Sequence, residues 1–340
     1  MKFFQDAVDV YFKMFGDRAF SVSSVFCEFT IGDKLFTIKW YGVIIAFGFL
    51  LAVLFGGRIA YTWKINLDKM IDVLISGTIL GVIGARAYYV IFAWDNYKAH
   101  FWDVFKIWEG GLAIYGGIIG GVIGAYIACK VRKMNFWNLL DLVGMSLLIG
   151  QGIGRWGNFA NQEAFGTNTD MPWGMWSEKI ATSLARDSAT LAERGIAVDP
   201  AGYVHPTFLY ESVWCLLGFV LLYVTLKKFR KFSGQLFLMY GMWYGLERMI
   251  VEGFRTDSLY IGASNVRVSQ ALSAAIALAC LVVFFILMIR FTKNPKPIEG
   301  VDWFPPDAVP TLKERKMARL AAEREAGTAQ TDNGQGTMDN

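Results

Sequence analysis

Polar side chains interrupt the long apolar runs of this sequence, and the densest interruption is the stretch 154–166. It follows the apolar run 139–153 and carries Arg155, Asn158 and Glu163 at close spacing. A lone arginine at the end of a membrane helix usually extends its charged head to the lipid headgroups. A dense polar cluster at membrane depth is costly and is by default functional. We therefore predict a binding or catalytic site in this stretch.

A second set of polar side chains forms a stripe in the run 234–252. Tyr244, Arg248 and Glu252 stand at positions i, i+4 and i+8, which places them on one face of a helix. Arg255 follows three residues after Glu252. The other candidate site residues at comparable depth are Arg86, Gly110, Gly111, Tyr115 and Glu211. If the runs pack as a bundle, these side chains converge at one end of it.

The arginines of this set are suited to bind an anion. An arginine side chain stays charged, and its planar fork binds phosphate through two hydrogen bonds. A phosphate at membrane depth most often belongs to a phospholipid headgroup, so we predict a polar cavity that binds an anionic phospholipid. The alternative is a structural ion-pair network that specifies helix packing. The glutamates available to neutralise the arginines are Glu163, Glu211, Glu247 and Glu252.

The sequence offers few metal ligands and no familiar cofactor motif. It has two histidines and four cysteines, and the cysteines lack the C-x-x-C spacing of zinc sites and redox pairs. The patterns G-x-x-x-x-G-K-[ST], G-x-S-x-G and H-E-x-x-H do not occur. We therefore predict either chemistry without a metal or a cofactor, or no chemistry at all, and no nucleic-acid partner.

The composition is that of a protein that crosses a membrane several times. Of 340 residues, 54% are hydrophobic and 18% are charged, and the charges gather in short blocks between apolar runs. Glycines four residues apart, such as Gly116, Gly120 and Gly124, predict close helix–helix approach. The prediction is an all-α polytopic membrane protein with about seven transmembrane helices, at 40–60, 71–93, 110–130, 138–155, 206–226, 234–252 and 268–289.

Basic residues favour one orientation in the membrane. They follow the first, third, fifth and seventh runs, where Lys64, Lys130 and Lys227 are examples, whereas the opposite loops carry both signs. By the positive-inside rule the N-terminus lies outside and the C-terminus in the cytoplasm. The stretch 154–166 then faces the outer side. Asp141, near the cytoplasmic end of its run, is predicted to be structural, as a helix cap or the partner of a basic residue.

The transmembrane region is predicted to span 40–290 and to be preceded by an outer arm, residues 1–39. The arm begins as an amphipathic surface segment and ends in a short strand pair, 26–29 and 34–38. A glycine between these two strands is suited to the turn that joins them.

Two further segments lie outside the apolar runs. The loop 156–205 predicts a small outer-face cap with a helix-like stretch at 178–195, rather than a separate domain. Residues 291–340 predict a cytoplasmic tail that is largely disordered, because they are broken by prolines and end in a polar stretch. A charged helix at 312–326 is possible within this tail.

The stretch 154–166 reads G-R-W-G-N-F-A-N-Q-E-A-F-G and closely resembles the signature of the prolipoprotein diacylglyceryl transferase family, G-R-x-G-N-F-x-N-x-E-x-x-G. The resemblance covers about 40–290. It implies a seven-helix, N-out and C-in enzyme of the bacterial cytoplasmic (inner) membrane with an active site toward the outer face. Other segments similar to this family are 40–42, 84–86, 109–117, 205–211 and 247–255.

The resemblance also implies a reaction. The diacylglyceryl group of phosphatidylglycerol would move to the thiol of the lipobox cysteine of a preprolipoprotein, which still carries its signal peptide. A thioether would form and glycerol phosphate would leave, as the first step of bacterial lipoprotein maturation. Such a reaction needs a thiolate and stabilisation of the charge on the departing phosphate.

Two competing functions remain open on the sequence alone. A lipid-binding scaffold or transporter would move phospholipid without transforming it, but many transporters carry an inverted repeat and we find none. Another phospholipid headgroup transferase is disfavoured because paired metal-binding carboxylates are missing.

Arg155 and Arg248 are the residues predicted to bind phosphate and to stabilise the leaving group. Asn158 and Glu163 are predicted to orient the headgroup glycerol or to hold Arg155. Glu252 is predicted to orient Arg248 from one helical turn away. Arg86, Tyr41, Gly110, Gly111, Glu211, Tyr244 and Arg255 complete the predicted phospholipid site.

Tyr115 is the third predicted catalytic residue. Many family members carry histidine at this position, and neutral imidazole is a good base near pH 7. Tyr115 could act as a phenolate if an arginine lowers its pKa. Alternatively, it donates a hydrogen bond to phosphate while the cationic field lowers the pKa of the thiol. His205, which precedes a proline at a predicted helix start, is expected to cap or orient.

Overall fold

The structure is a computed structural model and describes residues 2–3, 6–98, 101–258, 260 and 266–294. Its bundle contains six helices that are long and apolar enough, by length and composition, to cross a membrane. They are α1 (Trp40–Thr62), α2 (Leu67–Phe92), α3 (Ile114–Arg132), α4 (Phe136–Asn161), α6 (Thr207–Lys228) and α8 (Val268–Lys293). The predicted tail helix at 312–326 and the polar end of the chain lie outside the described residues.

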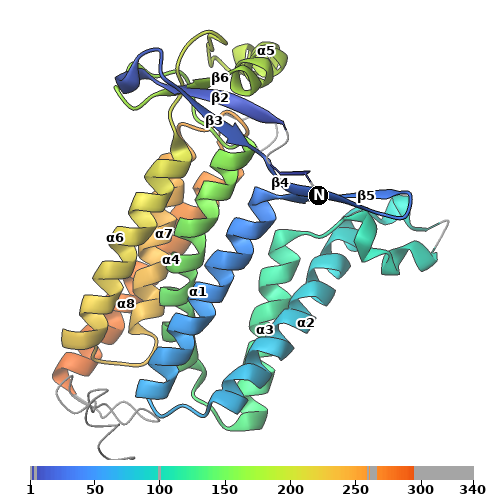
Figure 1. Cartoon of the computed structure of the whole chain (residues 1–340). Helices are drawn as coiled ribbons and strands as arrows, with labels where there is room; N and C mark the ends of the chain where they lie inside the picture. The colour runs from blue at the N-terminus through green and yellow to red at the C-terminus, as the bar shows by residue number, and fades with distance from the viewer. Residues whose placement is uncertain (1, 4–5, 99–100, 259, 261–265, 295–340) are drawn as a thin grey trace, which may run out of the picture.

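The run predicted at 234–252 forms α7 (Gln235–Val251), which is 17 residues long and is not among these six. It packs against α4, α6 and α8, so it belongs to the same bundle (Figure 1). The described helices therefore support six of the seven predicted spans by length and composition, and α7 completes the bundle as a shorter helix.

The ends of the helices follow from local capping. Asn66 and Asn135 precede α2 and α4, and each side chain accepts hydrogen bonds from two backbone N–H groups of the first turn. α4 ends at Gln162, whose φ of 51° is left-handed. This turn stops the helix within the stretch 154–166 and directs the chain away from the bundle.

The N-terminal region is built from strands: β1 (Lys2–Phe3), β2 (Ala7–Phe12), β3 (Ala19–Ser23), β4 (Val25–Ile31) and β5 (Lys34–Lys39). The predicted strand pair is confirmed as β4 and β5, which pair antiparallel across a turn at Gly32. Within the segment predicted to be an amphipathic surface arm, residues 7–23 form a further antiparallel pair, β2 and β3.

The loop 156–205 contributes β6 (Met175–Ser177) and α5 (Glu178–Glu193). β6 pairs antiparallel with β2, which gives the strand order β3-β2-β6, while β1, β4 and β5 form a second sheet. We call β2, β3, β6 and α5 the head, and the nearby end of the bundle the head end (Figure 1). The predicted helix in this loop is confirmed.

A small apolar core holds the head on the bundle. α5 buries Ile180 and Leu184 against Val10 of β2, and the same cluster contains Phe165 and Phe208 of the chain segments below. Because apolar side chains from both units share one core, the head has a fixed position above the ends of α4 and α6.

The opposite end of the bundle contains a buried ion pair. Asp141 of α4 and Arg230, in the α6–α7 turn, are almost completely buried, and Arg230 Nη2 lies 2.8 Å from Asp141 Oδ2. The backbone N–H groups of Gly234 and Phe237 also donate to Asp141. The prediction that Asp141 is structural is confirmed, with Arg230 as its basic partner.

Helices α2 and α3 approach each other closely at their glycines. A Cβ atom on Gly120 would overlap the carbonyl oxygen of Leu80, and one on Gly116 would overlap that of Gly84. The two helices therefore touch backbone to backbone, as the four-residue glycine spacing predicts.

We expect Gly120→Ala to lower the free energy of unfolding by about 1–3 kcal/mol, because the added methyl group must push α2 and α3 apart. Gly121→Ala is the matched control, since its Cβ would lie 3.5 Å from the carbonyl oxygen of Gly77, an ordinary contact. Both changes raise helix propensity equally. Denaturant titration in detergent micelles compares the variants, and equal stabilities would contradict close packing at Gly120.

Candidate active site

Two arginines and one glutamate from three helices meet at the head end of the bundle. Glu211 of α6 places Oε1 3.2 Å from Arg155 Nη2 of α4 and 3.1 Å from Arg248 Nη1 of α7. The Glu211 side chain is 1% exposed, whereas those of Arg155 and Arg248 are 18% and 16% exposed. Both guanidinium groups therefore share one buried carboxylate and keep part of their surface accessible.

Glu252 holds the second terminal nitrogen of the Arg248 guanidinium group. Its Oε2 accepts a hydrogen bond from Arg248 Nη2 at 2.5 Å, across one turn of the same chain. The predicted orienting role of Glu252 agrees with this contact. Arg248 is thus held from two sides, by carboxylates on α6 and at the end of α7.

Polar groups continue below the arginines into the bundle. The Cys215 thiol donates to Glu247 Oε2 at 3.9 Å, and Gln151 Nε2 donates to the Tyr240 hydroxyl at 2.9 Å. The ring of Tyr240 stacks on that of Tyr244, with centroids 5.8 Å apart. The stripe predicted on α7 therefore extends inward to residues that the sequence prediction did not include, Gln151 and Cys215.

Three buried oxygens of this region lack a hydrogen-bond partner among the described residues: Glu211 Oε2, Glu247 Oε1 and Gln151 Oε1. A buried acceptor without a donor is costly, and such groups are rare away from functional sites. These oxygens are therefore available to a bound substrate, a water molecule or a transferred proton.

The turn after α4 carries the amide and carboxylate groups of the predicted signature. Glu163 Oε1 accepts hydrogen bonds from Asn158 Nδ2 at 3.1 Å and from Asn161 Nδ2 at 3.3 Å. Arg155 is paired with Glu211, so the structure does not support the predicted alternative that Glu163 holds Arg155. The alternative of headgroup orientation stays a prediction.

Gly166 ends this turn where there is no room for a side chain. A Cβ atom there would lie 2.8 Å from Cβ of His205 and 3.2 Å from the carbonyl oxygen of Phe254. Its N–H donates to the carbonyl oxygen of His205 at 2.9 Å. The close approach links the stretch 154–166 to the entry of α6 and to the exit of α7.

His205 orients this junction. Its Nδ1 lies 3.0 Å from the Tyr210 hydroxyl, which also accepts a hydrogen bond from Trp173 at 2.7 Å. Burial lowers the pKa of the His205 imidazole below its usual value, which favours the neutral ring. These contacts agree with the predicted orienting role.

Arg255 is neutralised by a partner that the sequence prediction did not name. Its guanidinium donates two hydrogen bonds to Asp257, at 2.8 and 2.7 Å. Burial raises the pKa of the Asp257 carboxyl, but the hydrogen bond and the charge of Arg255 outweigh it, so the pKa lies below its usual value. Arg255 and Asp257 therefore form a charged pair.

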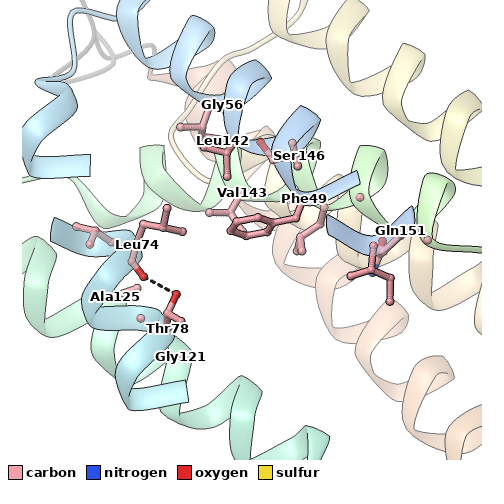
Figure 2. A pocket seen from close by; sticks show the side chains of 18 of the residues that line it. Phe49, Gly56, Leu74, Thr78, Gly121, Ala125, Leu142, Val143, Ser146 and Gln151 are labelled. Atoms are coloured by element: carbon pink, nitrogen blue, oxygen red, sulfur yellow. Dashed lines mark hydrogen bonds between the residues drawn. The ribbon is translucent and has the colours of Figure 1, made fainter. Parts of the chain in front are cut away.

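An apolar cavity of about 630 Å³ ends at Arg155 and Asn158 of α4. Helices α1, α2, α3 and α4 line it, with Phe49, Leu74, Leu142 and Val143 among the apolar walls (Figure 2). The hydroxyl of Thr78 bonds the carbonyl oxygen of Leu74 within its own helix, as the dashed line in Figure 2 shows. Polar side chains line only a minor part of this cavity.

The head end of the cavity is polar, because Tyr41, Arg155 and Asn158 line it there together with Gln151. A Cβ atom on Gly157 would meet the ring of Tyr41 at 2.9 Å, so α4 approaches Tyr41 closely. The predicted residues Tyr41, Arg155 and Asn158 thus border one space. This space is therefore apolar along most of its lining and carries a cationic group and amide groups at one end.

The comparisons with known proteins agree with this geometry. The family model of prolipoprotein diacylglyceryl transferase matches residues 28–286. The chain belongs to this family. The prediction made from the signature is thereby confirmed, as is the prediction of a transferase in lipoprotein biosynthesis.

Several relatives are similar in sequence to this chain over most of their own length. A phosphatidylglycerol–prolipoprotein diacylglyceryl transferase of Finegoldia magna is 42% identical over 257 residues, 76% of this chain and 92% of the relative. Proteins of the same name from Listeria monocytogenes and Acaryochloris marina are 43% and 42% identical. They cover 76% and 72% of this chain, and 88% and 84% of their own lengths are matched.

The family match includes Arg86, which lies near the end of α2 and is predicted to contribute to the phospholipid site. Its guanidinium donates hydrogen bonds to four backbone carbonyls, those of Asp103, Val104, Gly110 and Gly111, at 2.6–3.1 Å. It therefore holds the segment before α3 in place. Gly110 and Gly111 have positive φ values of 90° and 75°, so they form the turn that presents these carbonyls.

Tyr115, the third predicted catalytic residue, lies in the first turn of α3 and is 45% exposed. Its hydroxyl makes no hydrogen bond to any residue in the described part of the chain. The structure thus places it on the helix pair α2 and α3, whereas Arg155, Glu211 and Arg248 come from α4, α6 and α7.

Proposed function

We propose that this chain transfers the diacylglyceryl group of phosphatidylglycerol to the lipobox cysteine of a preprolipoprotein, with release of glycerol phosphate. The observation that carries this proposal is the convergence of Arg155 and Arg248 on Glu211, where Arg155 also lines the polar end of an apolar cavity. The family membership supports the choice of substrates. The reaction places this chain at the first step of lipoprotein maturation.

The lipid binds with its acyl chains in the cavity between α1, α2, α3 and α4. Its phosphate lies at Arg155 and Arg248, whose forks suit phosphate oxygens. Asn158 and Tyr41 border the same end and bond the headgroup glycerol or the ester groups. The shared carboxylate of Glu211 keeps both arginines in position before the lipid arrives, which reduces the reorganisation needed during reaction.

In the transfer step the sulfur of the cysteine attacks the glyceryl carbon that carries the phosphate. A C–S bond forms and the C–O bond to phosphate breaks, so the electron pair of that bond stays on the phosphate oxygen. Arg155 and Arg248 stabilise this developing charge. The same cationic field lowers the pKa of the thiol and favours the thiolate. The thiol proton leaves to a carboxylate or to water.

The orientation belongs to the proposal as well. The chain lies in the bacterial cytoplasmic membrane with the head on the outer side. Basic residues at the bundle end opposite the head, among them Lys64, Arg132 and Lys228, support this orientation through the positive-inside rule. The cysteine that follows a signal peptide emerges on that side.

The test uses purified protein in liposomes that contain phosphatidylglycerol, a lipobox peptide, and mass spectrometry of the peptide cysteine. We expect a mass increase of one diacylglyceryl group and the release of glycerol phosphate. Liposomes with phosphatidylcholine alone are the control. Transport of labelled lipid between leaflets without any change of the peptide would support a lipid transporter and would overturn the proposal.

Tyr115→Phe distinguishes the two proposed roles of the phenol. We expect a loss of less than about tenfold in kcat/KM, the size of one neutral hydrogen bond, because Tyr115 is half-exposed and its hydroxyl makes no hydrogen bond to a described residue. Loss of a general base would instead cost about 10²–10⁴-fold. The same liposome assay measures kcat/KM of this variant. A loss of about 10²–10⁴-fold would show that the hydroxyl takes part in proton transfer.

A further inference from the structure

A second cavity, of about 700 Å³, lies between the head and the turn that follows α4. Its floor is the second half of the stretch 154–166, from Asn161 to Phe165, and its roof is the polar face of α5. Lys39, at the start of α1, and Asp257, beyond α7, close its sides. The catalytic arginines are not part of its lining. This cavity is therefore a space distinct from the apolar lipid cavity.

One side chain links the two cavities. Glu163 lines the second cavity, and its carboxylate accepts a hydrogen bond from Asn158, which lines the lipid cavity. A molecule that extends from the second cavity past Glu163 thus reaches the polar end of the lipid cavity.

The lining carries charges of both signs. Three of its ionic side chains, Lys39, Glu178 and Lys179, make no hydrogen bond or ion pair with any described residue. A site for phosphate or for a lipid headgroup would concentrate positive charge. The mixture present here suits a polypeptide, whose backbone offers both donors and acceptors and whose side chains vary in charge. The ionic residues of the lining are Lys39, Glu163, Glu178, Lys179, Arg186, Asp187 and Asp257.

We propose that this cavity binds the polar segment of the preprolipoprotein that follows the lipobox cysteine, in extended conformation. The proposal rests on the proposed function. The signal peptide on the other side of the cysteine is apolar and belongs in the bilayer, so the chain after it must leave toward the head. The cavity exceeds what one glycerol phosphate fills and holds several residues of extended chain.

α5 presents its polar face to the cavity and is held in place by its buried apolar face. Ile180, Leu184 and Leu191 are buried on its apolar face, and Ser177 caps its first turn through a hydrogen bond to the N–H of Ile180. Thr182 and Ser183 lie on the face that lines the cavity. Large side chains at these two positions fill the cavity and leave the packed face unchanged.

The experiment compares two lipobox peptides, one that ends at the cysteine amide and one with six further polar residues. We expect wild type to modify both, with a lower KM for the longer peptide. Thr182→Trp and Ser183→Trp are expected to raise the KM of the longer peptide by about tenfold, the effect of about 1.4 kcal/mol of binding free energy. The KM of the short peptide and that of phosphatidylglycerol stay unchanged.

Ala192→Trp is the matched control, because Ala192 is exposed on α5 and lies outside the cavity lining. Lys179→Glu is a second variant that adds no bulk. We expect it to shift preference from acidic toward basic residues after the cysteine. Equal KM values for both peptides in wild type, or an equal effect of Ala192→Trp, would overturn this inference while the transferase function stands. Failure of wild type to modify either peptide would overturn both.

Discussion

Arg155→Ala and Arg248→Ala are each expected to lower kcat/KM for diacylglyceryl transfer by about 10²–10³-fold, the usual cost of removing one donor to a developing anion. Each arginine touches the same carboxylate, Glu211, from a different helix. Removing Arg155 leaves Glu211 paired with Arg248, whereas removing Arg248 leaves Glu211 paired with Arg155 but Glu252 without its partner. The helix content of each variant, measured by circular dichroism in detergent, shows that it is folded before activities are compared. Their kcat/KM therefore reports the phosphate interaction rather than a collapse of the site.

The liposome assay measures these losses with mass spectrometry of the peptide. Arg155→Lys and Arg248→Lys keep the charge but lose the planar fork, so intermediate activities are expected. Arg132→Ala is the control, because Arg132 is half-exposed and pairs with Asp72 at the opposite end of the bundle. Activity of Arg155→Ala within tenfold of wild type would contradict the role of Arg155 in binding phosphate.

Asp141→Ala is expected to have the largest effect on stability, a loss of about 3–5 kcal/mol in the free energy of unfolding. The change leaves the cation of Arg230 buried and without its carboxylate, and it removes the acceptor of two backbone N–H groups. Arg230 also lies over the ring of Trp63, with its guanidinium carbon 4.4 Å from the ring centroid.

Denaturant titration in detergent micelles, followed by tryptophan fluorescence, measures this loss. Asp72→Ala is the matched control, since it breaks an ion pair of the same type with Arg132 in an exposed position. An exposed pair contributes about 0–1 kcal/mol. If the free energy of unfolding falls by the same amount in both variants, the buried ion pair contributes no more to stability than the exposed one, and this prediction is wrong.

The sequence predicted the helices and the arginine cluster because both depend on local patterns. Apolar runs and flanking charges mark the helices, and the spacing of Tyr244, Arg248 and Glu252 marks one helix face. The pairing of Arg248 with Glu252 follows from that spacing. The sequence could not tell which arginine would share Glu211, because that contact joins three helices.

Arg86 shows the limit of reasoning from residue type. An arginine at membrane depth indicates a buried polar partner, but backbone carbonyls leave no mark in the sequence. The pairing of β2 with β6 was missed for a related reason. Strand pairs distant in sequence have no local signal, whereas β4 and β5 are joined by a short glycine turn.

The pairing of β2 with β6 also has a consequence for biosynthesis. The ribosome must add about 165 more residues after β2 before β6 exists, which at 5–20 residues per second takes roughly 8–30 s. During that time β2 has only β3 as a partner, and an isolated two-stranded hairpin is marginally stable in water. The head is therefore completed only after α1 to α4 have been made, and a nascent chain that stalls before β6 exposes an unpaired edge of β2 to chaperones and proteases.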